Sequence, residues 1–182
     1  MTLPNILTLL RVLLIPAFII LIINRSFGWA IVTFAVAGIT DGIDGLLARL
    51  THQRTELGAY LDPIADKLLL ASSFITLALI ELVPSWLAVI VISRDVIILV
   101  GITVLMLNDY RPQIRPSLVS KATTCLQIST ILFVLAERYY PIMRGPSWVV
   151  IYGAGLFTVL SGAHYIYRGA RILNGNAEDC SF

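Results

Sequence analysis

About six long apolar stretches, separated by short polar segments, constrain this chain more than any other feature. Each is long enough for a membrane-spanning helix, which needs roughly 20 mostly apolar residues. The chain has 182 residues, of which 58% are hydrophobic and only 13% charged, a composition that excludes an ordinary soluble domain. We therefore predict an all-α, polytopic membrane protein with six transmembrane helices, forming a single domain over residues 1–182.

The polar segments set the limits of the expected helices. We predict spans at about residues 4–23, 29–47, 58–80, 85–107, 120–136 and 148–167. The first stretch is long enough to span and no small-residue cleavage site follows it, so we expect a retained helix rather than a signal peptide. In the last span, Ala154, Thr158 and Gly162 recur at every fourth position, a spacing that permits close helix packing within the chain or with a second subunit.

Arginine is unevenly distributed between the two sets of loops. One side carries Arg49, Arg54, Arg111, Arg115, Arg168 and Arg171, whereas the other carries Arg25, Arg138 and Arg144. By the positive-inside rule, both termini face the cytoplasm. The net charge of +2 contains no basic run, so we expect a lipid bilayer as the surroundings and no nucleic-acid partner.

Four carboxylates interrupt the second and third apolar stretches: Asp41, Asp44, Asp62 and Asp66. On helices, the first two and the last two stand three and four residues apart, so each pair shares one helix face. Carboxylates held together repel each other unless cations neutralise them, and oxygen ligands suit Mg²⁺, Mn²⁺ or Ca²⁺. We therefore predict an acidic metal site at the cytoplasmic ends of the second and third helices.

Such a site has a clear chemical use. A pair of divalent ions can grip a diphosphate while a remaining carboxylate accepts the proton of an attacking hydroxyl. Thr55 is a candidate ligand contact, and small residues beside the acids leave room for a nucleotide: Gly42, Gly45, Ala48 and Gly58. The alternative is a set of solvated loop acids paired with Arg49, Arg54 and Lys67. We favour the site because the acidic segment runs into an apolar stretch without a polar break.

Polar residues on the first helix form a stripe of Asn5, Thr8 and Arg11. An arginine inside a membrane span is costly, so Arg11 either turns inward to acid or phosphate, or snorkels to the lipid interface.

Further cations lie in or near the fourth and fifth spans. Arg94, which precedes Asp95 in the fourth span, is a candidate for binding an anionic substrate, with a structural charge pair as the alternative. Lys121, near the start of the fifth span, is placed either to hold a headgroup phosphate or to snorkel to lipid phosphates. Arg115 lies in the polar loop before it.

The acidic segment also resembles a family signature. The pattern Asp-x-x-Asp-Gly-x-x-Ala-Arg, eight residues, Gly-x-x-x-Asp-x-x-x-Asp, here from Asp41 to Asp66, is similar to that of the CDP-alcohol phosphotransferases, and every position is filled. The resemblance implies an integral-membrane enzyme that is usually a homodimer. We expect it in the bacterial cytoplasmic (inner) membrane, and the arginine bias places its active site on the cytoplasmic side. It would move a phosphatidyl group from CDP-diacylglycerol to an alcohol and release CMP.

The resemblance also implies roles for individual residues. Two divalent ions, Mg²⁺ or Mn²⁺, would bind Asp41, Asp44, Asp62 and Asp66, with Asp62 and Asp66 as the catalytic pair and Asp66 as the general base. The cytidine nucleotide would lie among Gly45, Ala48, Arg49 and Gly58. The stripe on the first helix would approach the diphosphate.

The acceptor alcohol is inferred from the fourth and fifth spans. Phosphatidylglycerophosphate synthases of this family typically carry Arg-Glu, a second arginine eight residues later, and Gly-Lys-x-Lys-Thr. The matching positions here read Arg94-Asp95, Ile102 and, over 120–124, Ser-Lys-Ala-Thr-Thr. Two cations are missing, which weakens the case for glycerol 3-phosphate, a near-dianion that needs several cationic donors.

Residues 92–96 and 115–121 resemble instead the CMP-forming cardiolipin synthases. We therefore expect phosphatidylglycerol as the acceptor, with cardiolipin as the product and Arg94, Arg115 and Lys121 as acceptor-binding residues. Phosphatidylglycerophosphate synthesis is the alternative.

A divalent-cation channel or transporter would use the same four carboxylates. The acids, however, gather at one side of the membrane rather than along a path, and no second hydrophobic half repeats the motif. This class is the remote alternative.

Overall fold

The computed structural model consists of α-helices and contains no strand among the residues it describes. The backbone is described for residues 3–51, 56–107, 118–140 and 147–173, and the side chains for 10–40, 65–101, 119–140 and 147–167. The helices are α1 (Leu3–Ile23), α2 (Phe27–Thr51), α3 (Glu56–Leu79), α4 (Ser85–Leu107), α5 (Leu118–Tyr139) and α6 (Ser147–Leu173). The prediction of an all-α chain with six helices is confirmed within these ranges.

Three predicted spans end too early. The spans 29–47, 120–136 and 148–167 correspond to helices that continue to Thr51, Tyr139 and Leu173. Hydropathy marks the end of an apolar stretch, whereas a helix continues through residues such as alanine, arginine and leucine that favour it intrinsically. The predicted loops at these ends are correspondingly shorter.

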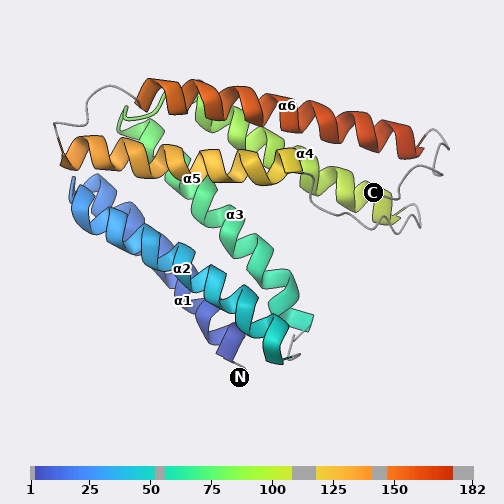
Figure 1. Ribbon diagram of the computed structural model, residues 1–182, viewed down its shortest axis with the longest axis horizontal. Helices are drawn as coiled ribbons and strands as arrows, with labels where there is room; N and C mark the ends of the chain where they lie inside the picture. Colours follow the sequence, from blue (N-terminus) through green and yellow to red (C-terminus); the bar gives the residue numbers. More distant parts are fainter. Residues whose placement is uncertain (1–2, 52–55, 108–117, 141–146, 174–182) are drawn as a thin grey trace.

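The helices form two groups that diverge from each other (Figure 1). In the first group α1 packs against both α2 and α3, and in the second α6 packs against both α4 and α5. Contacts of α3 with α4 and of α2 with α5 join the groups. Figure 1 shows the start of α1, the end of α2 and the start of α3 together at the free end of the first group. The acidic segments of α2 and α3 therefore belong to one end of the molecule.

The apolar core joins the two groups at the other end. Its buried side chains come from all six helices, and the rings of Phe18 and Phe34 lie 5.4 Å apart between centroids. Phe74, Leu87 and Leu135 add fully buried side chains from α3, α4 and α5. Burial of this apolar cluster holds the two helix groups together at this end, whereas their other ends diverge.

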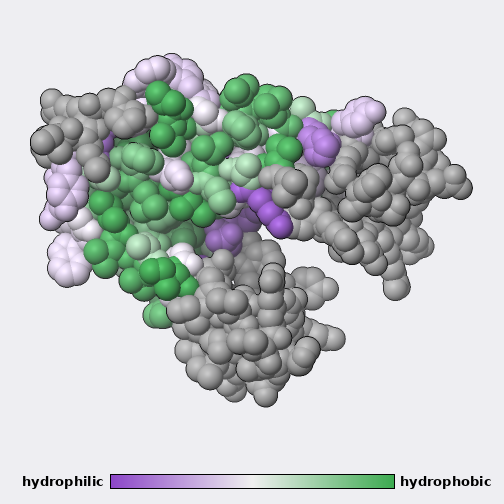
Figure 2. All heavy atoms as spheres, viewed as in Figure 1, coloured by the Kyte–Doolittle hydropathy of each residue, from purple (hydrophilic) through white to green (hydrophobic). Residues whose placement is uncertain are grey.

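The described residues on the face shown in Figure 2 are mostly apolar. Large hydrophobic side chains such as Leu13, Val89 and Leu156 are more than half exposed. Among the described side chains, two stretches are long and apolar enough to cross a membrane, Val119–Tyr139 and Ser147–Tyr167. The helices contain 21 to 27 residues, and helices of that length measure about 31 to 40 Å, against roughly 30 Å for a bilayer core. The six-span topology stays a prediction.

The small residues of α6 pack inside the chain. Ala154 and Thr158 are fully buried, and a β carbon at Gly162 would lie 3.7 Å from the Cγ of Arg94 on α4. Gly155 lies so close to Trp86 that its β carbon would be 2.7 Å from the indole ring. The predicted close helix packing is confirmed. The sequence left open whether the packing partner belongs to the same chain or to a second subunit, and in the structure it is a neighbouring helix of the same chain.

Candidate active site

The four aspartates lie on the two helices that the sequence predicted. Asp41 and Asp44 belong to the last part of α2, and Asp62 and Asp66 to the first half of α3, so both pairs have helical spacing. The side chains of the first three are outside the described residues, and Asp66 is partly buried. Among the described side chains, no group of three or more potential metal ligands comes together. The convergence of the acids on one centre stays a prediction.

The predicted nucleotide residues follow the same helices. Gly45, Ala48 and Arg49 lie on α2, which makes the last two helical rather than part of the expected loop, and Gly58 lies on α3. Thr55 lies outside the described residues. Ala48 follows Asp44 by four residues, so a helical Ala48 continues the helix face of Asp44 by a further turn.

The polar stripe of the first helix belongs to the same group. Asn5 and Thr8 lie on α1, with side chains outside the described residues, and α1 packs against both acidic helices. Arg11 is fully buried. Of the two orientations expected for Arg11, the inward one is therefore confirmed.

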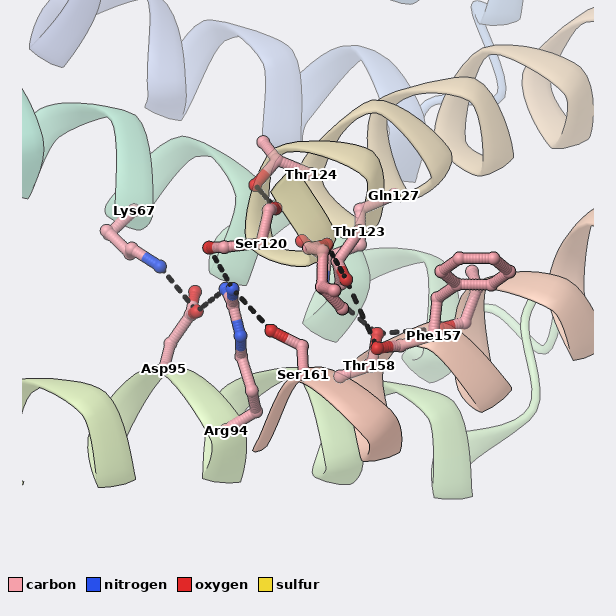
Figure 3. Close-up of polar contacts among 12 residues, drawn as sticks. Lys67, Arg94, Asp95, Ser120, Thr123, Thr124, Gln127, Phe157, Thr158 and Ser161 are labelled. Atoms are coloured by element: carbon pink, nitrogen blue, oxygen red, sulfur yellow. Dashed lines mark hydrogen bonds and ion pairs between the residues drawn. The ribbon is translucent and has the colours of Figure 1, made fainter. Parts of the chain in front are cut away.

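A charged cluster joins α3 to α4 immediately after Asp66 (Figure 3). Lys67 forms an ion pair with Asp95, and Nη1 of Arg94 donates to the same carboxylate oxygen at 2.6 Å. The side chain of Lys67 is 32% exposed, whereas those of Arg94 and Asp95 are 3% and 10% exposed. One largely buried carboxylate thus binds two cations from two helices.

Arg94 also reaches the two remaining helices of the second group. Its Nη2 donates to Oγ of Ser120 on α5 at 2.7 Å and to Oγ of Ser161 on α6 at 3.1 Å. Its Nε has no hydrogen-bond acceptor among the described residues. The structural charge pair that was the alternative reading of Arg94 is therefore present, and this packing shields the guanidinium from solvent.

Sequence reasoning did not assign Lys67 or Ser161 to this cluster. A usable signal was present for the lysine, because a cation that opens an apolar stretch needs a counter-charge and Asp95 is the single acid of the predicted fourth span. No such signal exists for Ser161, since serine is common in membrane helices.

The other predicted acceptor residues differ in accessibility. Lys121 is exposed near the start of α5, and Arg115 lies outside the described residues. Thr123, where the pattern considered for phosphatidylglycerophosphate synthases has a lysine, is fully buried, and its hydroxyl donates to the carbonyl oxygens of Val119 and Phe157 at 2.8 and 3.1 Å. Of the predicted acceptor cations whose side chains are described, Lys121 is the exposed one.

Comparison with known proteins decides the family. The sequence model of CDP-alcohol phosphatidyltransferases matches residues 1–160. The chain belongs to this family. The resemblance inferred from the motif is thereby confirmed.

The relatives of this chain are named after two different activities. A protein of Mycobacterium tuberculosis named probable phosphatidylglycerophosphate synthase is 38% identical over 193 residues, covering 98% of this chain and 87% of its own length. A CMP-forming cardiolipin synthase of Streptomyces coelicolor is 31% identical, covering 97% of this chain and 86% of its own length. A CDP-diacylglycerol–glycerol-3-phosphate 3-phosphatidyltransferase of Bacillus subtilis is 30% identical, covering 91% and 94%. Both acceptor types predicted from the sequence are therefore represented among the relatives.

Proposed function

We propose that this chain transfers a phosphatidyl group from CDP-diacylglycerol to a hydroxyl of a glycerol-based acceptor and releases CMP. The observation that carries the proposal is the complete Asp41–Asp66 motif, on α2 and α3, in a chain that matches the family over residues 1–160. Relatives named for this activity align with nearly the whole chain. The same findings favour an enzyme over a channel or transporter.

The donor set fits two divalent ions, Mg²⁺ or Mn²⁺. Asp41, Asp44, Asp62 and Asp66 would hold them, because four carboxylates of two helices need cationic neutralisation and offer the oxygen ligands that these ions prefer. When bound, the ions would neutralise the diphosphate.

The protein's own residues would direct the transfer. Asp66 would accept the proton of the acceptor hydroxyl while that oxygen attacks the phosphorus bearing diacylglycerol, and the bond from this phosphorus to the CMP oxygen would break. Asn5, Thr8 and the inward-facing Arg11 would approach the diphosphate. The residues around the cytidine would be Gly45, Ala48, Arg49, Thr55 and Gly58.

We propose phosphatidylglycerol as the acceptor and cardiolipin as the product. Arg94 is bound to Asp95, Ser120 and Ser161, and Thr123 supplies no charge, so Lys121 is the described acceptor cation that is exposed. Arg94 and Arg115 would support it. A lipid phosphodiester carries less charge than glycerol 3-phosphate and needs fewer cationic donors. The relative from Mycobacterium tuberculosis favours phosphatidylglycerophosphate synthesis as the second candidate.

The proposed setting is the cytoplasmic membrane of a bacterium. Six spans would form one domain over residues 1–182, with the acidic ends of α2 and α3 facing the cytoplasm, where CMP is released. The homodimer implied by the family resemblance is part of this proposal.

The deciding experiment is an assay of the purified protein with radiolabelled CDP-diacylglycerol and Mn²⁺ or Mg²⁺. Phosphatidylglycerol and glycerol 3-phosphate are supplied in separate reactions. Cardiolipin formed only from phosphatidylglycerol supports the first candidate, and phosphatidylglycerophosphate formed only from glycerol 3-phosphate supports the second. Absence of product from both would overturn a glycerol-based acceptor.

Two controls tie the activity to the acidic motif. Removal of divalent ions with a chelator should abolish turnover and their return should restore it. Asp66→Asn should lower turnover by roughly 100-fold or more, the usual contribution of a general base, while the fold stays intact. The matched variant Glu56→Gln removes a carboxylate from the same helix at a position that the motif leaves variable, and it should keep activity.

A further inference from the structure

A pocket of about 690 Å³ lies between the α1–α2 turn and the C-terminal end of α5. Two cations and four aromatic residues contribute to its lining: Arg25, Arg138, Phe27, Trp29, Tyr139 and Tyr140. Figure 1 shows the end of α5 beside the α1–α2 turn, at the opposite end of α1 and α2 from the acidic segments. The pocket is therefore separate from the candidate active site.

The two arginines give the pocket an uncompensated positive charge. Within the described part of the chain, neither of them forms an ion pair, and no carboxylate lines the pocket. Glu137, beside Arg138 in sequence, and Glu81, in the α3–α4 turn, do not contribute to the lining. Two cations that face one cavity attract an anion with phosphate-like geometry.

The backbone conformation of Arg25 is set by the way α1 ends. α1 ends in a Schellman motif, in which the N–H of Ser26 donates to the Leu21 carbonyl and the N–H of Arg25 to the Ile22 carbonyl, both at 2.9 Å. The motif places Arg25 at φ 56°, a left-handed conformation that glycine adopts without strain. Because the motif fixes the backbone of Arg25, it also fixes where this side chain leaves the chain at the edge of the pocket.

The rest of the lining suits a lipid. Trp29 and Val32 on α2 are 69% and 50% exposed and offer an apolar wall. Gly28 lets the end of α5 press against α2, because a β carbon there would lie 2.7 Å from the ring of Tyr139. Aromatic rings with polar tips are typical of the level of lipid headgroups. The pocket therefore combines a cationic head region with an apolar side.

We propose that this pocket binds an anionic phospholipid in the leaflet opposite the active site, with its phosphate between Arg25 and Arg138 and its acyl chains along Trp29 and Val32. The proposal goes beyond the transfer reaction. It requires that the chain spans the membrane and is independent of which acceptor the enzyme uses.

The test places the protein in lipid nanodiscs with Trp29 as its single tryptophan, by means of Trp86→Phe and Trp148→Phe. Fluorescence quenching is compared for dibrominated phosphatidylserine and dibrominated phosphatidylcholine. Phosphatidylserine is chosen because it is anionic but is neither the proposed donor nor the proposed acceptor. We expect stronger quenching by phosphatidylserine, and a roughly fivefold loss of this preference in Arg25→Gly and in Arg138→Gln, since each basic residue near an anionic lipid contributes about 1 kcal/mol.

Arg25→Gly distinguishes the effect of losing the cation from the effect of a misfolded turn. It removes the charge and relieves the backbone, so lipid preference should fall while thermal stability is kept. The matched variant Glu81→Gly acts on the equivalent position after α3, at φ 59°, and should keep the preference. Equal quenching by the two lipids, or a preference that survives in both arginine variants, would overturn the proposal. Loss of the preference on adding millimolar inorganic phosphate would overturn the lipid assignment in favour of a free-anion site.

Discussion

At the residue scale, Asp95 binds two cations from two helices. It accepts from Lys67 of α3 and from Arg94 of its own helix, and through Arg94 it is linked to α5 and α6. The two cations do not depend on it equally, because Arg94 is 3% exposed and Lys67 is 32% exposed. Water can compensate a lysine at that exposure but not an arginine that is nearly enclosed.

This asymmetry predicts different costs for two neutral substitutions. Asp95→Asn should lower the free energy of unfolding by about 3 kcal/mol, since it leaves a buried guanidinium without its counter-ion. Lys67→Met should cost about 1 kcal/mol or less, because Arg94 still neutralises Asp95 and the lysine is partly exposed. Denaturation of the purified variants in detergent measures both values. Equal costs would mean that Lys67, rather than Arg94, is the main partner of Asp95.

At the element scale, small and polar residues decide how α6 packs on its neighbours. Gln127 Nε2 on α5 donates to the hydroxyl of Thr158 at 3.2 Å, and Thr130 donates across to the carbonyl of Val150 at 3.3 Å. On the other side, Gly155 accommodates the ring of Trp86 from α4. Hydrogen bonds and close approach of this kind hold helices together where lipid removes the usual hydrophobic drive.

Two glycines of α6 offer a matched test of this packing. Gly155→Val should destabilise the protein by about 1 to 3 kcal/mol, because the new side chain overlaps Trp86 and forces α4 and α6 apart. Gly153→Val should be neutral or slightly stabilising, since a β carbon there meets no atom within 4 Å and valine favours helix over glycine. Thermal unfolding of the two variants distinguishes them. A similar loss in both would assign the effect to the backbone of α6 instead of the α4–α6 contact.

At the scale of the whole molecule, the two helix groups meet at the apolar core and part towards the acidic end. The cluster of Lys67, Arg94 and Asp95 lies where α3 crosses to the second group, directly after Asp66 (Figure 3). A reacting centre formed by α2 and α3 would therefore be held in register with the helices that carry the proposed acceptor residues.

The proposed topology predicts which turns face the two sides of the membrane. In a variant with Cys125 and Cys180 replaced by serine, Asn24→Cys in the α1–α2 turn should react with an impermeant maleimide in intact cells. His52→Cys, in the predicted cytoplasmic loop, should react only after the cells are permeabilised. The reverse pattern would invert the orientation, and labelling of both sites in intact cells would rule out the proposed arrangement of the first spans.

The sequence by itself determined the class of structure, the helices to within a few residues and the family. These properties depend on local quantities. Hydropathy over about 20 residues predicts a membrane helix, and the backbone hydrogen bonds of an α-helix join residues only four apart. The Asp41–Asp66 motif likewise lies within one short segment of the chain. Helix ends such as that of α2 were missed because intrinsic helix propensity continues past the apolar stretch.

Only the tertiary structure decided which residues of different helices contact each other. The role of Arg94 was open in the sequence because its contacts lie 26 residues away at Ser120 and 67 residues away at Ser161. The same holds for Gly162 of α6, whose neighbours could have belonged to a second subunit, and for the pocket between the α1–α2 turn and the end of α5. Contacts between distant residues depend on how the helices cross, which is set by the packing of all six together and is not encoded in any single stretch.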